Sequence, residues 1–353
     1  MSHQPCYKTG TVTIPNFTLE SGETLSEAEL AYERCGPPDA PAILVCHALT
    51  GHHRTIGTPD EPGWWRGLIG KGGYIDTNDY QVVTFNVLGG CNGSTGPQGI
   101  DPEKVEPYGV HFPRLTIRDL VEAQYVGLKI LGFNRLKAVI GGSLGGMQVL
   151  EWGLMYPDFI EALFPIAVTP TFSDYGIAFN HIAKQAILHA GDQGLSIARM
   201  IGMMTYRSDC LFNERFGRNK QAHGEDHDTF EVESYLTYQG AKLNDRFNKE
   251  SYLTLLDVMN SHDIGRGRGG LEQVIHGYQV PVYGIGFTRD LVYPPDVLGA
   301  FLTAIQHEGG IAGYYEVESK YGHDGFLVEF EKWGWIVKEK LTELDALVQE
   351  KQV

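Results

Sequence analysis

The chain has 353 residues, a hydrophobic fraction of 42% and a formal net charge of −16 at pH 7. This charge argues against a nucleic-acid surface or an anionic membrane as partner, because both need clustered lysine and arginine. It does not exclude a small anionic substrate, which needs only one or two nearby cations. The length allows two ordinary domains or one α/β core with an insertion.

The five cysteines are scattered, and no two of them form a C-x-x-C pair. A disulfide framework and a zinc site are therefore not expected, and we expect no metal and no permanently bound cofactor. The first ten residues lack the apolar core of a signal peptide, and no run of about 18 apolar residues occurs in the chain. The sequence predicts a soluble cytoplasmic protein.

The first part of the chain has the pattern of strands. Strands are predicted at residues 11–20, 28–36, 42–47 and 80–87. The last two, AILVCH and YQVVTFNV, are almost continuously apolar, which is typical of strands buried on both faces of a mostly parallel sheet. A helix is predicted over 117–132, with Thr116 as its N-cap and Asp119 three residues further on.

Strands alternate with helices in the middle of the chain. Strands at 136–142 and 161–168 flank a helix that follows Ser143. This alternation predicts a parallel sheet with right-handed crossovers. From about 170 to 275 helical patterns dominate, interrupted by a polar stretch at 219–233 that we expect to be a solvated loop or helix face.

The strand pattern returns at 281–287 and 313–319, and the chain ends in a helix with apolar residues from Phe326 to Leu344 spaced by three and four. We therefore expect a core of residues 1–169 and 276–353, interrupted by a helical lid of residues 170–275 that covers the sheet.

A candidate nucleophile lies between a predicted strand and a predicted helix. Residues 141–145, GGSLG, match G-x-S-x-G in the strand–turn–helix setting that gives this motif its meaning. Ser143 is therefore expected to form a covalent acyl intermediate. The motif does not say whether water or another molecule takes the acyl group, so a hydrolase and a transferase both agree with it.

A serine nucleophile needs a base, usually a histidine that a carboxylate holds. In the fold that carries this motif the chain order is serine, then acid, then histidine. Asp290 and His323 each follow a late strand, at the strand ends where α/β sheets place their sites. Asp296 competes with Asp290, but its position after two prolines is more typical of a helix cap, so Asp290 is favoured.

The oxyanion that forms during acyl transfer needs backbone N–H donors. Leu144, which follows the nucleophile, is expected to supply one donor. The loop at residues 47–51, HALTG, is expected to supply the other, with Leu49 as the candidate. His47 is interpreted as a structural residue that shapes this turn.

A series of segments extends from about residue 40 to the end: HALTG, PGWWRGLIGKGGYIDTNDY, NVLGGCNGSTGP, FPRLTIRDLVEAQ, GGSLGGMQVLEW, TYRS and YGHDGFL. Together they resemble the homoserine O-acetyltransferases, the acyltransferase branch of the α/β-hydrolase superfamily. The resemblance implies an α/β-hydrolase fold with a mostly parallel sheet, flanking helices and a helical lid. It makes Ser143 the nucleophile, Asp290 the acid and His323 the base of an acetyl transfer from acetyl-CoA to L-homoserine.

The resemblance also implies a substrate pocket formed by Thr50, Arg199, Tyr206 and Asp324. Homoserine is a zwitterion, so its carboxylate suits an arginine fork and its ammonium suits a carboxylate. Arg199 and Tyr206 are about two helical turns apart, so both can face one pocket. Asp324 adjoins His323, which places the hydroxyl of the bound amino acid near the base.

Several alternatives stay open at this point. Members of the same branch use succinyl-CoA or acylate serine, and an ester or thioester hydrolase has the same fold. After HALTG the chain reads HHRTIGTPDE, where many relatives carry a DSHVAG-like segment. Arg54, Arg66 and Lys71 are candidates for binding the CoA phosphates. A homodimer through the helical lid is expected, from the methionine-rich helix there and from the resemblance.

Overall fold

The computed structural model describes residues 7–221 and 228–350, and eight of their strands form one sheet in the order β1-β2-β6-β3-β9-β10-β11-β12. The strands are β1 (Lys8–Thr18), β2 (Thr24–Cys35), β3 (Ala42–Cys46), β6 (Gln81–Phe85), β9 (Ala138–Gly142), β10 (Leu163–Ile166), β11 (Val282–Phe287) and β12 (Ala312–Val317). β2 is antiparallel to β1 and to β6, and all other neighbours are parallel. The expected mostly parallel sheet is therefore confirmed.

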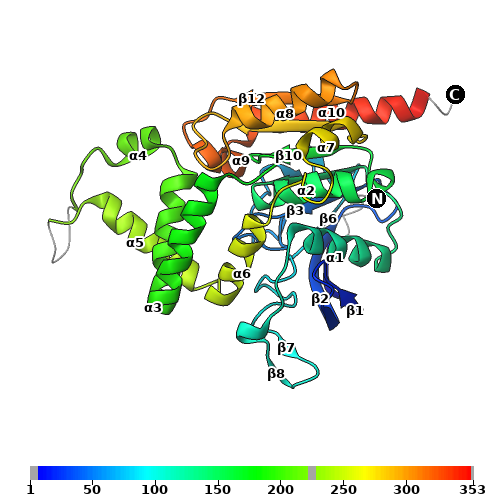
Figure 1. The fold of residues 1–353 in the computed structure, drawn as a ribbon. Coiled ribbons are helices and arrows are strands. Elements are labelled where there is room, and N and C mark those ends of the chain that lie inside the picture. The colour runs from blue at the N-terminus through cyan, green and yellow to red at the C-terminus, as the bar shows by residue number, and fades with distance from the viewer. Residues whose placement is uncertain (1–6, 222–227, 351–353) are drawn as a thin grey trace.

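Four very short strands lie outside this sheet. They are β4 (Ile69–Gly70), β5 (Ile75–Asp76), β7 (Ile100–Asp101) and β8 (Glu106–Pro107). β4 pairs with β5, and β7 pairs with β8. The β7–β8 pair projects from the molecule at the bottom of Figure 1, away from the sheet.

The sheet separates two apolar cores. Along the fully buried strand β3, Leu44 packs into one core while Ile43 and Val45 pack into the other. This alternation follows from the two-residue period of a strand. Helices α1 (Ile117–Ile130), α2 (Leu144–Met155), α7 (Leu271–Gly277) and α8 (Pro295–His307) contribute to the first core, and α10 (Phe330–Glu350) contributes to the second.

The N-terminus of α1 has the predicted cap. The Thr116 hydroxyl accepts from the Asp119 N–H, and the Asp119 carboxylate accepts from the Thr116 N–H at 2.7 Å. The last predicted helix differs, because it is broken into α9 (Gly325–Val328) and α10 at Glu329. The Glu329 side chain turns inward to the buried hydroxyl of Ser319, which explains why the helical pattern is interrupted there.

Helix α8 was not predicted, although Asp296 was expected near a helix start. Pro294 is the N-cap of α8, Pro295 is its first residue, and Asp296 lies in its first turn. Proline is well suited to this position because the first helical N–H groups have no partner within the helix. Short 3-10 helices also occur: η1 (Gly109–His111), η2 (Pro157–Phe159) and η3 (Gly322–Asp324).

The segment between β10 and α7 is helical, as expected. It consists of α3 (Asp174–Tyr206), α4 (Asp209–Phe216), α5 (Glu231–Asn244) and α6 (Lys249–Asn260). These helices form the helical lid, the group beside the sheet in Figure 1. Residues 222–227 of the expected polar loop lie outside the described residues. Within the described ranges, no helix is both long and apolar enough to cross a membrane.

Helix α3 is a hairpin of two arms. The backbone leaves the helical conformation at Gly191, with φ 57° and ψ −125°. A Cβ on Gly194 would lie only 2.1 Å from the carbonyl oxygen of Ala186. Residues eight apart in a straight helix are separated by about 12 Å, so this contact requires the second arm to fold back along the first.

The lid joins the core through a narrow stem. Thr171 and Asp263 form an antiparallel bridge. The Phe172 N–H donates to the His262 carbonyl at 2.9 Å, beside this bridge. The stem lies inside the expected lid range of 170–275, and it brings the start and the end of the lid to the same place beside β10.

Candidate active site

Ser143 lies at the turn between β9 and α2. Its φ of 59° and ψ of −125° are unusual for a residue with a side chain. The chain can turn this sharply because Gly141 and Gly145 have no Cβ, and a Cβ at Gly145 would lie 2.1 Å from the Cys46 carbonyl oxygen. The strained turn places the serine at the C-terminal edge of the sheet, where α/β proteins hold their ligands.

The candidate acid and base meet at the same edge. His323 lies in η3 after β12, and its Nδ1 is 2.7 Å from Oδ2 of Asp290, which follows β11. Oδ1 of Asp290 accepts from the backbone N–H groups of Val292 and Tyr293, each at 2.9 Å. Asp296, the competing acid, is exposed in α8, and so the structure brings Asp290 and not Asp296 to the histidine.

Backbone and side-chain hydrogen bonds hold the two loops of this pair together. The Ser319 N–H donates to the Thr288 hydroxyl at 2.9 Å, and Arg289 Nη1 donates to the Ser319 carbonyl at 2.9 Å. These bonds join the end of β12 to the loop after β11. They fix the separation between Asp290 and His323, and no motif or spacing in the chain indicates them.

The charges around His323 favour its protonated form. Burial lowers the pKa of His323, but the charge of Asp290, its hydrogen bond and the charge of Asp324 outweigh burial and raise the pKa above the usual value. A general base must be neutral to accept a proton. The pH at which His323 becomes active therefore depends on the two carboxylates that face it.

Both expected oxyanion donors lie beside the nucleophile turn. Leu49 and Leu144 are buried, and among the described residues no carbonyl or side chain accepts a hydrogen bond from either backbone N–H. Leu144 is the first residue of α2, where helical N–H groups have no partner within the helix. Both N–H groups therefore remain available for an oxygen of the substrate, and their role stays a prediction.

His47 shapes the loop that carries Leu49. Its Nε2 accepts from the Val87 N–H at 3.0 Å, so the proton lies on Nδ1, which is 2.8 Å from the Ala48 carbonyl. Burial lowers the pKa of His47 to about 4. A neutral histidine with both nitrogens occupied agrees with the structural role that we expected.

Two of the expected substrate residues lie together on the lid, and one of them, Tyr206, lies next to the candidate base. The ring of Tyr206 is 5.6 Å from the ring of His323, centroid to centroid. The guanidinium of Arg199 lies 5.8 Å from the Tyr206 ring centroid. Both residues are on the second arm of α3, so the two-turn spacing does place them together.

Asp324 and Thr50 have partners that the sequence analysis missed. Arg207 Nε donates to Oδ2 of Asp324 at 2.9 Å, and Arg207 Nη1 donates to the Tyr235 hydroxyl at 2.7 Å. Arg246 Nη1 donates to the Thr50 carbonyl at 2.7 Å. Arg207 stands in the quoted segment TYRS and could have been considered, whereas nothing in the sequence marks Arg246.

A narrow cavity lies above Ser143. Ser143 lines it from the core, and most of the other lining residues belong to the lid, such as Phe179, Ala198, Tyr206 and Tyr252. The lid therefore forms the roof of the site. Among the described residues, no three His, Cys, Asp or Glu side chains are grouped as a metal ion would require.

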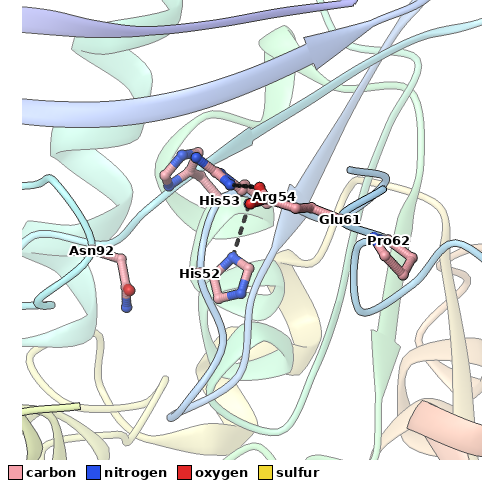
Figure 2. Close-up of a pocket in the computed structure, with 6 residues that line it drawn as sticks. All are labelled: His52, His53, Arg54, Glu61, Pro62 and Asn92. Carbon is pink, nitrogen blue, oxygen red and sulfur yellow. Dashed lines mark hydrogen bonds and ion pairs between the residues drawn. The ribbon is translucent and has the colours of Figure 1, made fainter. Parts of the chain in front are cut away.

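A second, wider pocket of about 460 Å³ lies beside the oxyanion loop (Figure 2). It is lined by His52, His53, Arg54, Glu61, Pro62 and Asn92. The Arg54 side chain forms an ion pair with Glu61, and the Arg54 backbone N–H donates to His52 Nδ1 at 3.1 Å. Of the three candidates for the CoA phosphates, only Arg54 lines this pocket, and its charge is balanced by Glu61.

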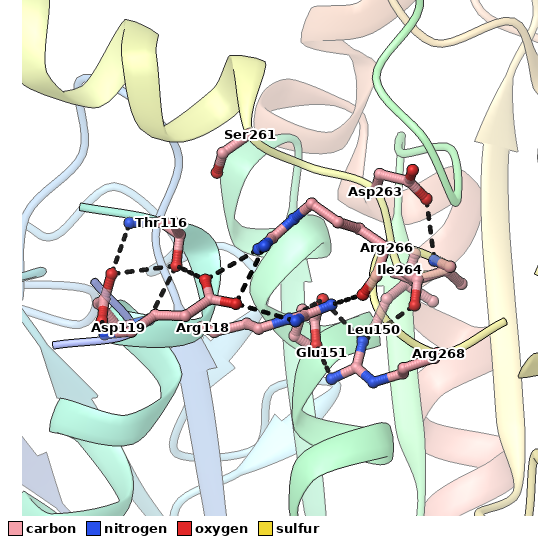
Figure 3. Close-up of polar contacts among 12 residues, drawn as sticks. Thr116, Arg118, Asp119, Leu150, Glu151, Ser261, Asp263, Ile264, Arg266 and Arg268 are labelled. Carbon is pink, nitrogen blue, oxygen red and sulfur yellow. Dashed lines mark hydrogen bonds and ion pairs between the residues drawn. The ribbon is translucent and has the colours of Figure 1, made fainter. Parts of the chain in front are cut away.

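Helix α2, which begins directly after Ser143, is anchored by a buried carboxylate (Figure 3). Glu151 is 2% exposed and accepts from Arg268 through both oxygens, at 3.0 and 2.6 Å. Arg118 of α1 donates to the same carboxylate at 3.3 Å and to Glu20 at 2.9 Å. Because Arg268 lies just after the stem, this network joins α2 to the chain that leaves the lid.

Comparison with known proteins agrees with this architecture. A model of the alpha/beta hydrolase fold matches residues 41–187. The homoserine O-acetyltransferase of Moorella thermoacetica is 44% identical, over 92% of this chain and 93% of its own length. A crystal structure of homoserine O-acetyltransferase from Staphylococcus aureus is 40% identical over 95% of each chain, with a TM-score of 0.82.

The fold is shared more widely. The crystal structure of esterase E22 covers 95% of this chain with a TM-score of 0.87, at 21% identity. At that identity the similarity concerns the fold alone. The chain therefore has the expected α/β-hydrolase fold, with the helical lid inserted after β10.

Removing Arg268 tests the anchor of α2. In Arg268→Ala the buried Glu151 keeps only Arg118, and we expect the free energy of unfolding to fall by about 3 kcal/mol. Arg135→Ala is the matched control, because Arg135 is 68% exposed in its pair with Glu161 and such pairs contribute about 0–1 kcal/mol. Urea unfolding measures both variants, and equal losses would contradict the anchoring role.

Removing the charge of Asp324 tests the electrostatics of His323. Because that charge raises the pKa of His323, Asp324→Asn should lower the pKa and move the acid limb of the pH–rate profile to lower pH. The acylation rate with p-nitrophenyl acetate measures this limb. Asp296→Asn is the control and should leave the limb in place, and an unmoved limb in Asp324→Asn would refute the assignment.

Proposed function

The chain belongs to the family of homoserine O-acetyltransferases, and on that basis we propose that it transfers an acetyl group from acetyl-CoA to the hydroxyl of L-homoserine. The observation that carries the proposal is the buried His323–Asp290 pair at the same sheet edge as Ser143. Asp324 follows His323 in the chain, and Arg199 lies beside Tyr206, whose ring contacts His323. O-acetylhomoserine would then enter methionine biosynthesis in the cytoplasm. Acetyl-CoA acts as a co-substrate, and no permanently bound cofactor takes part.

The first half-reaction loads the acetyl group onto the enzyme. His323 Nε2 takes the proton of Ser143 Oγ, which attacks the thioester carbonyl carbon. The backbone N–H groups of Leu49 and Leu144 hold the negative carbonyl oxygen. The carbon–sulfur bond then breaks, and the sulfur of CoA leaves with the proton from His323.

The second half-reaction passes the acetyl group to homoserine. Arg199 holds the carboxylate of the amino acid, while Asp324 accepts a hydrogen bond from its ammonium. Arg207 donates a hydrogen bond to Oδ2 of Asp324, so Oδ1 is the oxygen that would accept from the substrate. The homoserine hydroxyl gives its proton to His323, attacks the acetyl carbon and releases Ser143.

Transfer must be faster than hydrolysis, so water has to be kept from the acetyl-serine. The cavity above Ser143 is narrow and is roofed by apolar and aromatic residues of the lid. The ion pair of Asp324 with Arg207 offers a charged site for an amino acid. An ester hydrolase with an apolar pocket would not need such a site. These features support an acyl acceptor other than water.

We also propose a homodimer that forms through the lid. Six apolar side chains of α3 and α5 are between 43% and 60% exposed: Tyr175, Ile182, Leu188, Ile197, Met204 and Tyr238. Tyr175 and Ile182 are seven residues apart, as are Ile197 and Met204, so each pair lies on one face of its helical arm. Exposed apolar residues gathered on one element are typical of an interaction surface.

Product analysis tests the acceptor. With acetyl-CoA and homoserine together, we expect O-acetylhomoserine and CoA in equal amounts, and only slow CoA release when homoserine is omitted. Mass spectrometry measures O-acetylhomoserine, and a thiol assay measures the CoA that is released. Serine and succinyl-CoA in the same mixture serve as competing substrates. Rapid CoA release without any amino acid, or a succinylated product in excess, would contradict the proposal.

Light scattering after gel filtration tests the dimer. The double variant Ile182→Asp/Ile197→Asp should run as a monomer while the unaltered chain runs as a dimer, because charges are costly in an apolar interface. Ile130→Asp is the matched control, since Ile130 is 51% exposed at the end of α1 and outside the lid. A monomeric unaltered chain, or a dimeric double variant, would refute the interface.

A further inference from the structure

Tyr293 faces all three members of the candidate triad. Its backbone N–H donates to Asp290 Oδ1 at 2.9 Å. Its ring stacks on the His323 ring, with centroids 5.1 Å apart and planes at 30°. Its hydroxyl is near enough to Ser143 for the serine hydroxyl to act on its pKa. One residue therefore contacts the acid through its backbone and the base through its ring, and its hydroxyl lies near the nucleophile.

The hydroxyl of Tyr293 is buried without a satisfactory partner. The residue is 1% exposed, and within the described residues no group forms a hydrogen bond of ordinary geometry with its oxygen. A buried hydroxyl that lacks a partner destabilises the folded state, and a phenylalanine would fill the same space without that loss. We therefore expect this hydroxyl to form its hydrogen bond during the reaction.

The ring is held firmly enough to aim this hydroxyl. Phe172 lies on the ring with centroids 5.6 Å apart, and His323 also stacks on it. The backbone is fixed by the bond to Asp290. A donor that is already in place when charge develops costs no reorganisation during the reaction, which is the condition for strong electrostatic stabilisation.

The phenol also stays protonated. Burial raises the pKa of Tyr293 well above its usual value, the Ser143 hydroxyl lowers the pKa by less, and the charge of Asp290 adds to the rise. Tyr293 is therefore a neutral hydrogen-bond donor near neutral pH.

We propose that the Tyr293 hydroxyl is a catalytic group that donates a hydrogen bond to Ser143 Oγ whenever negative charge builds on that oxygen. The inference rests on the proposed acetyl-enzyme mechanism and adds to it a donor for the nucleophile oxygen itself. The oxyanion donors act on a different atom, the carbonyl oxygen of the acetyl group.

Charge builds on Ser143 Oγ twice in the cycle. In acylation, Oγ loses its proton to His323 Nε2 as it forms the bond to the thioester carbon. In deacylation, the bond between the acetyl carbon and Oγ breaks, the electron pair returns to Oγ, and His323 gives the proton back. Tyr293 keeps its own proton in both steps, so the balance of atoms and electrons is unchanged.

The variant Tyr293→Phe removes the hydroxyl and keeps the ring and the backbone bond. We expect kcat for acetyl transfer to fall about 100-fold, the effect of losing one preorganised donor, with little change in KM. The melting temperature should stay the same or rise, because an unpaired buried hydroxyl is lost. The acid limb of the pH–rate profile should not move, because Asp290 and Asp324 still act on His323.

Tyr80→Phe is the matched control. Tyr80 is also buried, and its hydroxyl bonds to Asp345 of α10, outside the active site, so this variant should keep full activity. All rates are divided by the fraction of protein that a fluorophosphonate labels at Ser143, so that unfolded protein is not counted. A fully active Tyr293→Phe, or one whose acid limb shifts, overturns the proposal.

The same comparison with p-nitrophenyl acetate separates this proposal from the proposed function. Acylation of Ser143 by this ester is common to transferases and esterases, and Tyr293→Phe should slow it about as much as it slows acylation by acetyl-CoA. If the unaltered chain makes no O-acetylhomoserine, the transferase function fails. That result leaves the role of Tyr293 standing, whereas cleavage of the ester by Tyr293→Phe at the unaltered rate refutes that role whichever acceptor the enzyme uses.

Discussion

The buried hydrogen bond between Asp290 and His323 is the interaction on which the site depends. A carboxylate in this position is costly to bury unless its oxygens are all engaged. Oδ2 meets His323 Nδ1 at 2.7 Å, and two backbone N–H groups of the same loop satisfy Oδ1. This arrangement requires β11 and β12 to be neighbours in parallel, because only then do their C-terminal loops meet at one edge of the sheet.

The lid converts this edge into a closed site. Its stem beside β10 and the reversal of α3 at Gly191 carry the second arm of α3 over the nucleophile, which brings Tyr206 to His323. Arg207, at the end of the same helix, then reaches Asp324 of the core. The Arg207–Asp324 ion pair and the narrow cavity above Ser143 thus both depend on one helical hairpin. The Glu151–Arg268 pair attaches the chain that leaves the lid to α2.

The parts of the site that follow from chain order could be predicted from the sequence. Ser143, Asp290 and His323 each follow a strand, and a parallel sheet brings such positions to one edge. The cap at Thr116 is equally local, and the structure confirms it. The bond between Arg207 and Asp324 joins residues 117 apart, and its existence depends on how the lid lies on the core. No periodicity or spacing encodes that placement.

Other features escaped prediction for different reasons. The break at Glu329 depends on the buried Ser319 hydroxyl, which attracts a side chain that the helical pattern treats as solvated. Tyr293 looks like an ordinary apolar residue in the segment DLVYPPD, and only its contacts with His323 and Asp290 make its hydroxyl notable. In both cases a polar atom acquires its role from tertiary packing, after the secondary structure is already set.

In the proposed cycle Ser143 carries the acetyl group between the two substrates. This step can be measured by mixing the protein with acetyl-CoA alone, stopping the reaction with acid and determining peptide masses. The peptide containing Ser143 should gain the mass of one acetyl group. Adding homoserine before the acid should remove this mass as O-acetylhomoserine appears. Turnover with no acetyl group on Ser143, or with the acetyl group on another residue, would rule out Ser143 as the carrier.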